Sequence, residues 1–324
     1  MKIGITGLQG AGKTTIFRLL TTRPDARRVG NGKLSFPDKS GFANPPNPNI
    51  ASIDIPDERL DYLANVLQPK KTTYAKIEFI DPPGFTKSSL SSLQVVEGMI
   101  YVVNSPESLQ ELKSELILRD MEICENSLKK SIDPKEQESL EKCKSILSEG
   151  KSIRKLELNE AQEKQLRGFG FLTLKPSIVI INVSQDKTED RGQKTIQVQG
   201  KLELEFSELS ADEQKEYAKE FNIGEPLLNR FTKEGLPQLN IISFFTTVGQ
   251  EVRAWQIQEG ISIIKAAGKV HSAMEHGFIR AEIIGFENFK QAGSFKEAKE
   301  KGLIQTVKQD YIVKDGDIIE FKFN

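Results

Sequence analysis

Gly7-Leu8-Gln9-Gly10-Ala11-Gly12-Lys13-Thr14 is the stretch that decides the fold, because it matches the phosphate-binding pattern G-x-x-x-x-G-K-[ST]. The apolar residues 2–6 before it predict a strand, and the amphipathic residues 13–20 predict a helix. The three glycines let the backbone curl so that its N–H groups form an anion-binding nest at the start of the helix. A plain glycine-rich turn is the alternative. Strand, loop, Lys-Thr pair and helix in this order favour a nucleotide-binding domain.

The side chains of this loop have distinct predicted roles. We expect Lys13 to reach the β- and γ-phosphates and to act in catalysis. The Thr14 hydroxyl is expected to ligate Mg²⁺, which prefers oxygen ligands. The residues of this loop predicted to bind nucleotide are Gly7, Gly10, Ala11, Gly12, Lys13, Thr14 and Thr15.

The composition limits the classes of partner. The chain has 324 residues, enough for more than one domain, and its 45 Lys and Arg nearly balance 46 Asp and Glu. We therefore expect no binding to DNA or membranes, and any contact with RNA must be local. No basic leader precedes the first strand and no apolar run approaches the ~20 residues of a membrane helix, which predicts a soluble, cytoplasmic protein. Cys124 and Cys143 are expected to be bystanders in helices.

Strands alternate with helices along the first part of the chain. Residues 50–55, 75–80, 99–103 and 177–181 predict strands, the last two of them buried on both faces of a parallel sheet. Leu60, Leu63, Ala64 and Leu67 predict a helix, and residues 22–49, rich in Gly, Pro and Asn, predict a mobile loop. This order predicts an α/β domain over residues 1–238.

A helical insertion is expected within this domain, at residues 106–168. Leucines recur there at helical spacing, and Asp133-Pro134-Lys135-Glu136 predicts an N-cap, a first-turn proline and a capping-box Glu between two helices. We expect an antiparallel, coiled-coil-like hairpin that is largely solvated, with one narrow apolar stripe.

The last segment, residues 239–324, is predicted to be a small, mainly β domain. A helix is expected before it, near residues 211–221. Residues 279–284, 310–313 and 318–323 predict strands, and Lys314-Asp315-Gly316-Asp317 predicts a hairpin turn.

Two further motifs fit a nucleotide site. Asp81-Pro82-Pro83-Gly84 follows a predicted strand, where P-loop NTPases carry D-x-x-G. Asp81 would hold Mg²⁺ through water, and the Gly84 amide would sense the γ-phosphate and act in catalysis. Such a turn is also common in ordinary loops. Phe85 stands where a Ras-like enzyme has the Gln that orients water, so hydrolysis cannot use that route.

Asn182-Val183-Ser184-Gln185 stands where guanine-binding domains have N-K-x-D. Gln185 lacks the carboxylate that pairs with guanine, so guanine preference is not expected, whereas Asn182 could accept from an adenine amine. A plain strand-to-loop turn is the alternative. Gly200 would belong to the last base-contacting loop. The residues predicted to contact the base are Asn182, Val183, Gln185 and Gly200.

These motifs together resemble the Obg-like ATPase (YchF) family of P-loop NTPases, in the translation-factor class. The resemblance is densest in the C-terminal third, and the family strings there are Phe244-Phe245-Thr246, Glu251-Val252-Arg253-Ala254-Trp255, Ala266-Ala267-Gly268-Lys269-Val270-His271, Gly277-Phe278-Ile279-Arg280-Ala281-Glu282 and Tyr311-Ile312-Val313-Lys314-Asp315-Gly316-Asp317-Ile318-Ile319. Two more are Ile53-Asp54-Ile55-Pro56-Asp57-Glu58-Arg59-Leu60 and Glu115-Leu116-Ile117-Leu118-Arg119-Asp120-Met121-Glu122. The resemblance implies a Ras-like, OBG-type G domain with a coiled-coil insertion, followed by a ubiquitin-like β-grasp (TGS) domain.

The resemblance also implies a function. It implies ATP rather than GTP, slow Mg²⁺-dependent hydrolysis without a catalytic Gln, and association with ribosomes or ribosomal RNA. We expect a nucleotide-switched regulator with ATP/ADP and Mg²⁺ as cofactors. A non-hydrolysing adaptor that binds RNA or ribosomes, and a GTPase, are the alternatives.

This chain departs from the family pattern at several positions. Gln9 and Gly10 replace the Pro and Asn of the family loop, and Pro82 and Pro83 replace the Ile and Ala of its D-I-A-G-L. The switch threonine aligns with Pro45, beside Asn44 as a substitute. Gln185 stands where the family has Glu, and the insertion is shorter. The sequence therefore predicts a divergent member.

Overall fold

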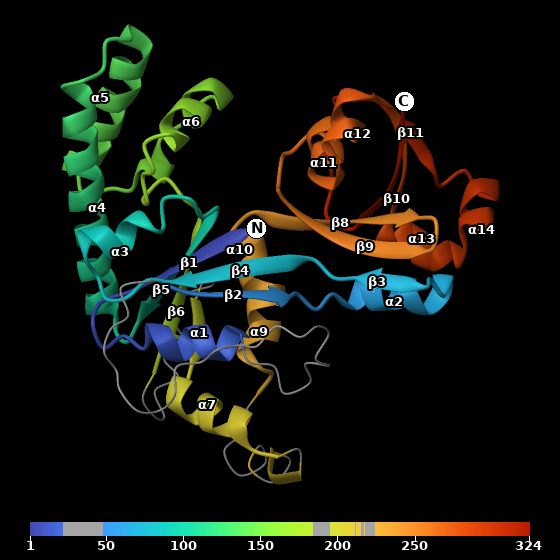
Figure 1. The fold of residues 1–324 in the computed structure, drawn as a ribbon, viewed down its shortest axis with the longest axis horizontal. Coiled ribbons are helices and arrows are strands. Elements are labelled where there is room, and N and C mark those ends of the chain that lie inside the picture. Colours follow the sequence, from blue (N-terminus) through green and yellow to red (C-terminus); the bar gives the residue numbers. More distant parts are fainter. Residues whose placement is uncertain (22–47, 184–194, 211, 215–216, 218–223) are drawn as a thin grey trace. The chain divides into compact units, whose positions relative to one another are not determined.

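The computed structural model describes residues 1–21, 48–183, 195–210, 212–214, 217 and 224–324 (Figure 1). It divides into two compact units, and each is described by itself. The N-terminal unit contains residues 2–52 and 78–231, and the C-terminal unit contains residues 53–77 and 232–324 together with Met1. Most of the predicted mobile loop (22–47) and Gln185 lie outside the described residues.

A six-stranded sheet forms the centre of the N-terminal unit. Its order is β2-β4-β1-β5-β6-β7, and β1 pairs in parallel with both β4 and β5. The strands are β1 (Lys2–Thr6), β2 (Asn49–Asp54), β4 (Lys76–Asp81), β5 (Gly98–Val103), β6 (Ser177–Asn182) and β7 (Thr195–Val198). Every residue of β5 is buried, as its continuous apolar run predicts. The α/β fold class is thereby confirmed.

Helices cover both faces of this sheet. Leu112 and Leu116 of α4 and Leu90 of α3 pack on Met99 and Tyr101 of β5. Helix α1 contacts β1, α7 and α9. The bounds are α1 (Lys13–Thr21), α3 (Lys87–Ser91), α4 (Pro106–Leu128), α5 (Pro134–Ser148), η1 (Ile153–Lys155), α6 (Glu160–Arg167), α7 (Gly200–Glu208) and α9 (Leu227–Arg230). Few residues of the helix expected near 211–221 are described.

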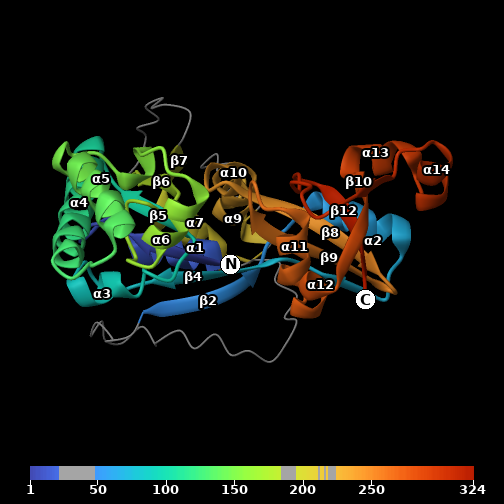
Figure 2. The same cartoon turned by 90° about the horizontal axis from the view of Figure 1, so that it is seen from above.

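The helical insertion has a core of its own. Helices α4 and α5 lie side by side (Figure 2), and α6 contacts α5. Cys124, Leu140, Cys143, Leu166 and Phe171 are each at most 1% exposed, whereas most other residues of α4 and α5 are exposed or partly exposed. The expected single apolar stripe is therefore present, and it packs against α6 and Phe171. The sequence reasoning missed α6 because that helix is short and polar, and only Leu166 anchors it.

One predicted cap is formed and one is not. The Asp133 side chain accepts from Lys135 N at 3.0 Å and Pro134 opens α5, as predicted. The capping box expected at Glu136 is not formed, because the Asp133 carboxylate bonds to the backbone of Lys135 rather than to that of Glu136. The cap is therefore held by one bond rather than two.

A second six-stranded sheet forms the C-terminal unit. Its order is β11-β10-β12-β8-β9-β3; β8 and β9 form an antiparallel hairpin, and β12 pairs with β8 in parallel. The edge strand β3 comes from far away in the sequence and pairs in parallel with β9. The strands are β3 (Lys71–Thr73), β8 (Ile241–Val248), β9 (Glu251–Gln258), β10 (Phe278–Gly285), β11 (Gln305–Val307) and β12 (Asp317–Phe323).

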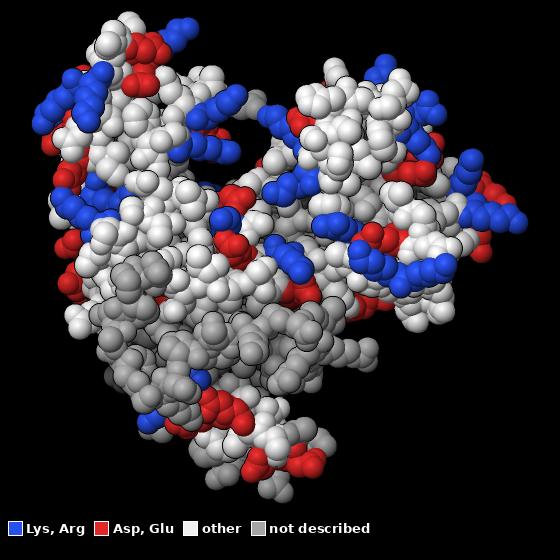
Figure 3. All heavy atoms as spheres, viewed as in Figure 1, with Lys and Arg blue, Asp and Glu red and all other residues white. Residues whose placement is uncertain are grey.

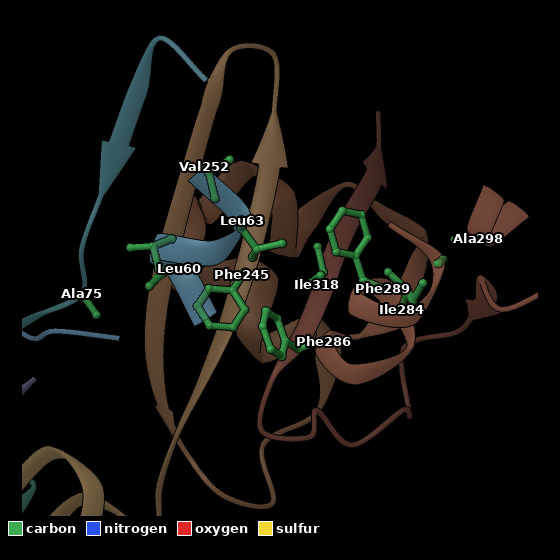
Figure 4. Packing of buried hydrophobic residues seen from close by; sticks show 12 residues of the cluster. Leu60, Leu63, Ala75, Phe245, Val252, Ile284, Phe286, Phe289, Ala298 and Ile318 are labelled. Carbon is green, nitrogen blue, oxygen red and sulfur yellow. The ribbon is translucent and has the colours of Figure 1, made fainter. Parts of the chain in front are cut away.

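Adjacent residues of β8 supply the cores on the two faces of this sheet. Phe244 packs with α11 on one face, and Phe245 packs with α2 and α13 on the other (Figure 4). Both side chains are fully buried, as the alternation of a central strand requires. The helices are α2 (Glu58–Leu67), α11 (Ile263–Val270), α12 (Ser272–His276), α13 (Phe286–Ala292) and α14 (Phe295–Glu300), and the π-helix η2 (Phe231–Gly235) and α10 (Leu236–Gln238) precede β8.

The strand predicted at residues 310–313 is absent. Ile312 forms only an isolated bridge with Ser262, while Tyr311 O and Val313 N bond to the backbone of Ile263 and Ile261. The segment therefore pairs with the loop before α11 and not with a neighbouring strand. The turn at 314–317 is present, with Gly316 at φ +85°, but it joins no hairpin. The domain boundary between residues 238 and 239 stays a prediction. In the structure, residues 53–77 and 232–238 belong to the same compact unit as residues 239–324.

Arg59 fastens α2 to this sheet. Its guanidinium donates to Asp57 at 2.9 and 3.0 Å and to Asp315 at 2.6 Å, and it lies 5.3 Å from the centre of the Phe245 ring. Burial alone would lower the pKa of Arg59, but the two carboxylates outweigh burial and raise it. Asp315 also accepts from Ser243 N at 2.8 Å. Asp315 in the turn is therefore bonded both to Arg59 of α2 and to Ser243 of β8.

Replacing Arg59 with Ala should therefore lower the free energy of unfolding by about 2 kcal/mol, because charge-assisted hydrogen bonds to two carboxylates are lost. Urea denaturation followed by the fluorescence of Trp255, the only tryptophan and a residue of β9, measures it. Lys301→Ala is the control, because its exposed pair with Glu297 should contribute less than about 0.5 kcal/mol. Equal effects of the two variants would contradict this role of Arg59.

Candidate nucleotide-binding site

The phosphate loop lies at the carboxyl end of β1. This strand lies between β4 and β5, where the chain order of the sheet reverses, and ligands of open parallel sheets bind outside the strand ends at this place. Helix α1 begins directly after the loop, at Lys13, so its free N–H groups face the loop. The fold thus places the loop where the sequence pattern predicts an anion site.

The glycine spacing follows from the geometry of the loop. Gly10 and Gly12 have φ of +81° and +91°, which side chains rarely adopt. A Cβ at Gly12 would also collide with the Asn182 amide, and one at Gly7 would collide with the carbonyl of Val102. Larger residues at 7 and 12 would therefore push the loop away from β5 and from Asn182.

Lys13 is held against this loop. Its Nζ donates to the carbonyl of Gly7 at 2.8 Å. Burial lowers the pKa of Lys13, and the charge of the Asp81 carboxylate opposes that shift. An ammonium group therefore lies at the start of α1, where the first N–H groups have no partner within the helix, and a polyphosphate requires this chemistry.

Asp81 ends β4 and is only 2% exposed. Its Oδ2 accepts from Thr14 Oγ1 and from Asn49 Nδ2, each at 3.1 Å. Its buried Oδ1 has no partner among the described residues. Burial raises the pKa of Asp81, against the opposing effects of those two hydrogen bonds and of Lys13.

The residues at Asp81 fit a magnesium site. A buried carboxylate oxygen without a partner is costly, and a metal-bound water would satisfy it. No cluster of three His, Cys, Asp or Glu side chains exists among the described residues. One carboxylate and one hydroxyl suit Mg²⁺, which keeps several waters and takes further oxygens from substrate phosphates.

Gly84 and Phe85 follow this carboxylate. Gly84 is exposed and has φ of +67°, and no atom lies within 4 Å of a Cβ built there. The Phe85 side chain packs against the cluster that contains Ile80 and Leu90. The position therefore offers no polar group to an attacking water.

Asn182 links two loops of the predicted site. Its Nδ2 donates to Ala11 O and its Oδ1 accepts from Gly200 N, both at 3.1 Å. Gly200 is close to Thr15, and Val183 N bonds to Val198 O at 2.8 Å. Asn182 thus supports the phosphate loop, and one N–H of Nδ2 and the second lone pair of Oδ1 take no part in these two hydrogen bonds.

The structure brings together the phosphate loop, Asp81, Asn182 and Gly200, as the sequence predicted for one site. Sequence reasoning missed Asn49 and considered Asn44, which lies outside the described residues. The available signal was a polar side chain at the start of a strand, but its partner depends on which strand lies beside it. Among the described residues no helix is long and apolar enough to cross a membrane.

Comparison with known proteins identifies relatives along the whole chain. The protein named "Ribosome-binding ATPase YchF" of Buchnera aphidicola subsp. Schizaphis graminum is 34% identical over 100% of this chain and 99% of its own length. The chain belongs to the YchF family. Proteins of the same name from Escherichia coli O157:H7 and Bacillus subtilis are 32% and 30% identical, over at least 99% of this chain and 98% of theirs.

Two further matches concern the C-terminal region and the fold. The YchF-GTPase_C family model, described as "Protein of unknown function (DUF933)", matches residues 241–324. The structure of the Schizosaccharomyces pombe YchF GTPase matches with a TM-score of 0.76 and 23% identity, over 99% of this chain and 97% of that one. The alignments with the relatives span 370–373 positions, so those YchF proteins have segments that this 324-residue chain lacks.

The steric contact between Gly12 and Asn182 can be distinguished from the backbone strain of a positive φ by comparing two variants. Gly12→Ala should lower the free energy of unfolding of nucleotide-free protein by about 1 kcal/mol more than Gly10→Ala does, since both positions have positive φ but only Gly12 abuts Asn182. Chemical denaturation of both variants measures the difference. Equal losses would mean that Asn182 moves aside at no cost.

Proposed function

We propose that this protein binds ATP with Mg²⁺, hydrolyses it slowly, and acts as a nucleotide-switched regulator on ribosomes in the cytoplasm. The observation that carries the proposal is the convergence of the phosphate loop and Lys13 with an oriented, half-satisfied Asp81 carboxylate. The names of the relatives support ATP hydrolysis and ribosome binding.

Each part of the nucleotide has a proposed set of contacts. Gly7, Gly10 to Thr15 and the amide of Gly84 would hold the phosphates, and Thr14 and Asp81 would hold Mg²⁺. When bound, Mg²⁺ would supply positive charge to the phosphate oxygens. Asn182, Val183, Gln185 and Gly200 would border the base, and the uncharged Gln185 favours adenine over guanine.

Slow turnover follows from what the site lacks. The Phe85 side chain is apolar and packs against a core cluster, so it can neither orient nor deprotonate water. Lys13 and Gly84 would then act by charge and positioning alone. Intrinsic rates of P-loop enzymes that depend on positioning are on the order of 10⁻⁴ to 10⁻² per second.

A non-hydrolysing adaptor is the second candidate. Pro82 and Pro83 stiffen the turn that would respond to the γ-phosphate, which favours a fixed geometry over a switch. Such a protein would use bound nucleotide to set a surface for RNA or the ribosome. On the face shown in Figure 3, basic and acidic side chains of the described residues lie interspersed on each unit, so neither sign of charge dominates among them.

Lys13→Ala should weaken ATP binding about 100-fold, or about 2.7 kcal/mol, because the charge-assisted contacts of the ammonium are lost. Calorimetric titration with ATP and Mg²⁺ measures it. Lys113→Ala, an exposed position on α4, is the matched control and should bind as wild type. Unchanged affinity in Lys13→Ala would contradict the proposed phosphate site. A tenfold or larger preference of wild type for GTP would reject the adenine assignment.

Single-turnover phosphate release separates the two candidates. Slow release from ATP with Mg²⁺, absent in Lys13→Ala, is expected of the ATPase. Tight ATP binding with no phosphate release above background, even with added ribosomes, would exclude the ATPase and support the non-hydrolysing adaptor. Cosedimentation with ribosomes, in ATP and in ADP, tests whether the ribosome is a partner. If the protein is absent from the ribosome pellet with both nucleotides, ribosome binding is rejected.

A further inference from the structure

The Asp81 carboxylate is asymmetric in its contacts. Both hydrogen bonds, from Thr14 Oγ1 and Asn49 Nδ2, end on Oδ2 at 3.1 Å. Oδ1 is buried and has no partner among the described residues. One oxygen is thus anchored by two donors while the other remains available.

The two donors differ in what else they can do. A hydroxyl has lone pairs, so Thr14 can donate to Asp81 and still offer oxygen to a cation. The NH₂ group of Asn49 can only donate, and its amide oxygen would repel Asp81 if the two ends were exchanged. Asn49 therefore cannot serve as the metal ligand through the atom that faces Asp81.

The backbone around Asn49 keeps it in place. Asn49 is the first residue of β2, Asp81 is the last residue of β4, and these strands are neighbours in the sheet. Asn49 is partly buried, whereas the next residue, Ile50, is 56% exposed. Alternation along the strand thus turns Asn49 toward the site and Ile50 away from it.

From this geometry we propose that Asn49 is a positioning residue of the magnesium site. It anchors Oδ2 and so presents Oδ1 of Asp81 to the water shell of the ion. The proposal rests on the proposed function, since it requires an ATP site that uses Mg²⁺.

A magnesium titration tests the proposal without measuring hydrolysis. ATP affinity is measured by calorimetry at increasing Mg²⁺, and in excess EDTA. Asn49→Ala and the near-isosteric Asn49→Leu should raise the Mg²⁺ concentration of half effect about tenfold, because a hydrogen bond to a charged group contributes about 1.5 kcal/mol or more. Affinity in EDTA should stay within about twofold of wild type. Ile50→Ala should leave both quantities unchanged.

The outcomes separate three explanations. A half-effect concentration within twofold of wild type for both Asn49 variants would overturn the assignment. A parallel fall of EDTA affinity and melting temperature would mean that Asn49 only stabilises the strand, which also overturns it. Wild type that binds no ATP at any Mg²⁺ concentration would overturn the proposed function, and with it the role of Asn49.

Discussion

The candidate site of the N-terminal unit depends on a buried carboxylate, Asp81, at the end of a sheet strand. Taking Asp81 out of water is unfavourable, and the chain compensates for only half of it, with two donors on a single oxygen. Native proteins rarely leave such a group unsatisfied, and those that do usually have a use for it. Beside it lie the phosphate loop and the ammonium group of Lys13, which is bonded to the carbonyl of Gly7. The unpaired Oδ1 of Asp81 is therefore available to a ligand.

Part of this could be predicted from the sequence. The phosphate loop, the buried strand β5 and the Asp81 turn are local patterns, and their positions follow once the sheet is parallel. The glycines at 10 and 12 are needed for their positive φ, which the pattern of the loop already encodes. Membership of the YchF family likewise rests on strings that can be read without a structure.

Other features depend on which segments become neighbours. Asn49 meets Asp81 only because β2 lies beside β4. The sequence around Asn49 does not indicate which strand will be the neighbour of β2. The missing strand at 310–313 is apolar enough to pair, yet the loop before α11 takes its backbone bonds. Helix α6 escaped prediction because it is short and polar and contributes one buried leucine, Leu166, to the core of the insertion. In each case the deciding partner is distant in sequence.

The sheet of the C-terminal unit also has a consequence for biosynthesis. Helix α2 and strand β3 complete this sheet, yet they precede β8 by more than half of the chain. At ordinary translation speeds, roughly ten seconds or more separate their emergence from that of β8. During that interval the apolar face of α2 has no sheet to cover. A nascent chain of this protein thus carries an unfinished hydrophobic surface until its last part is made, and a fragment that starts at residue 239 would lack the strand that closes the β9 edge.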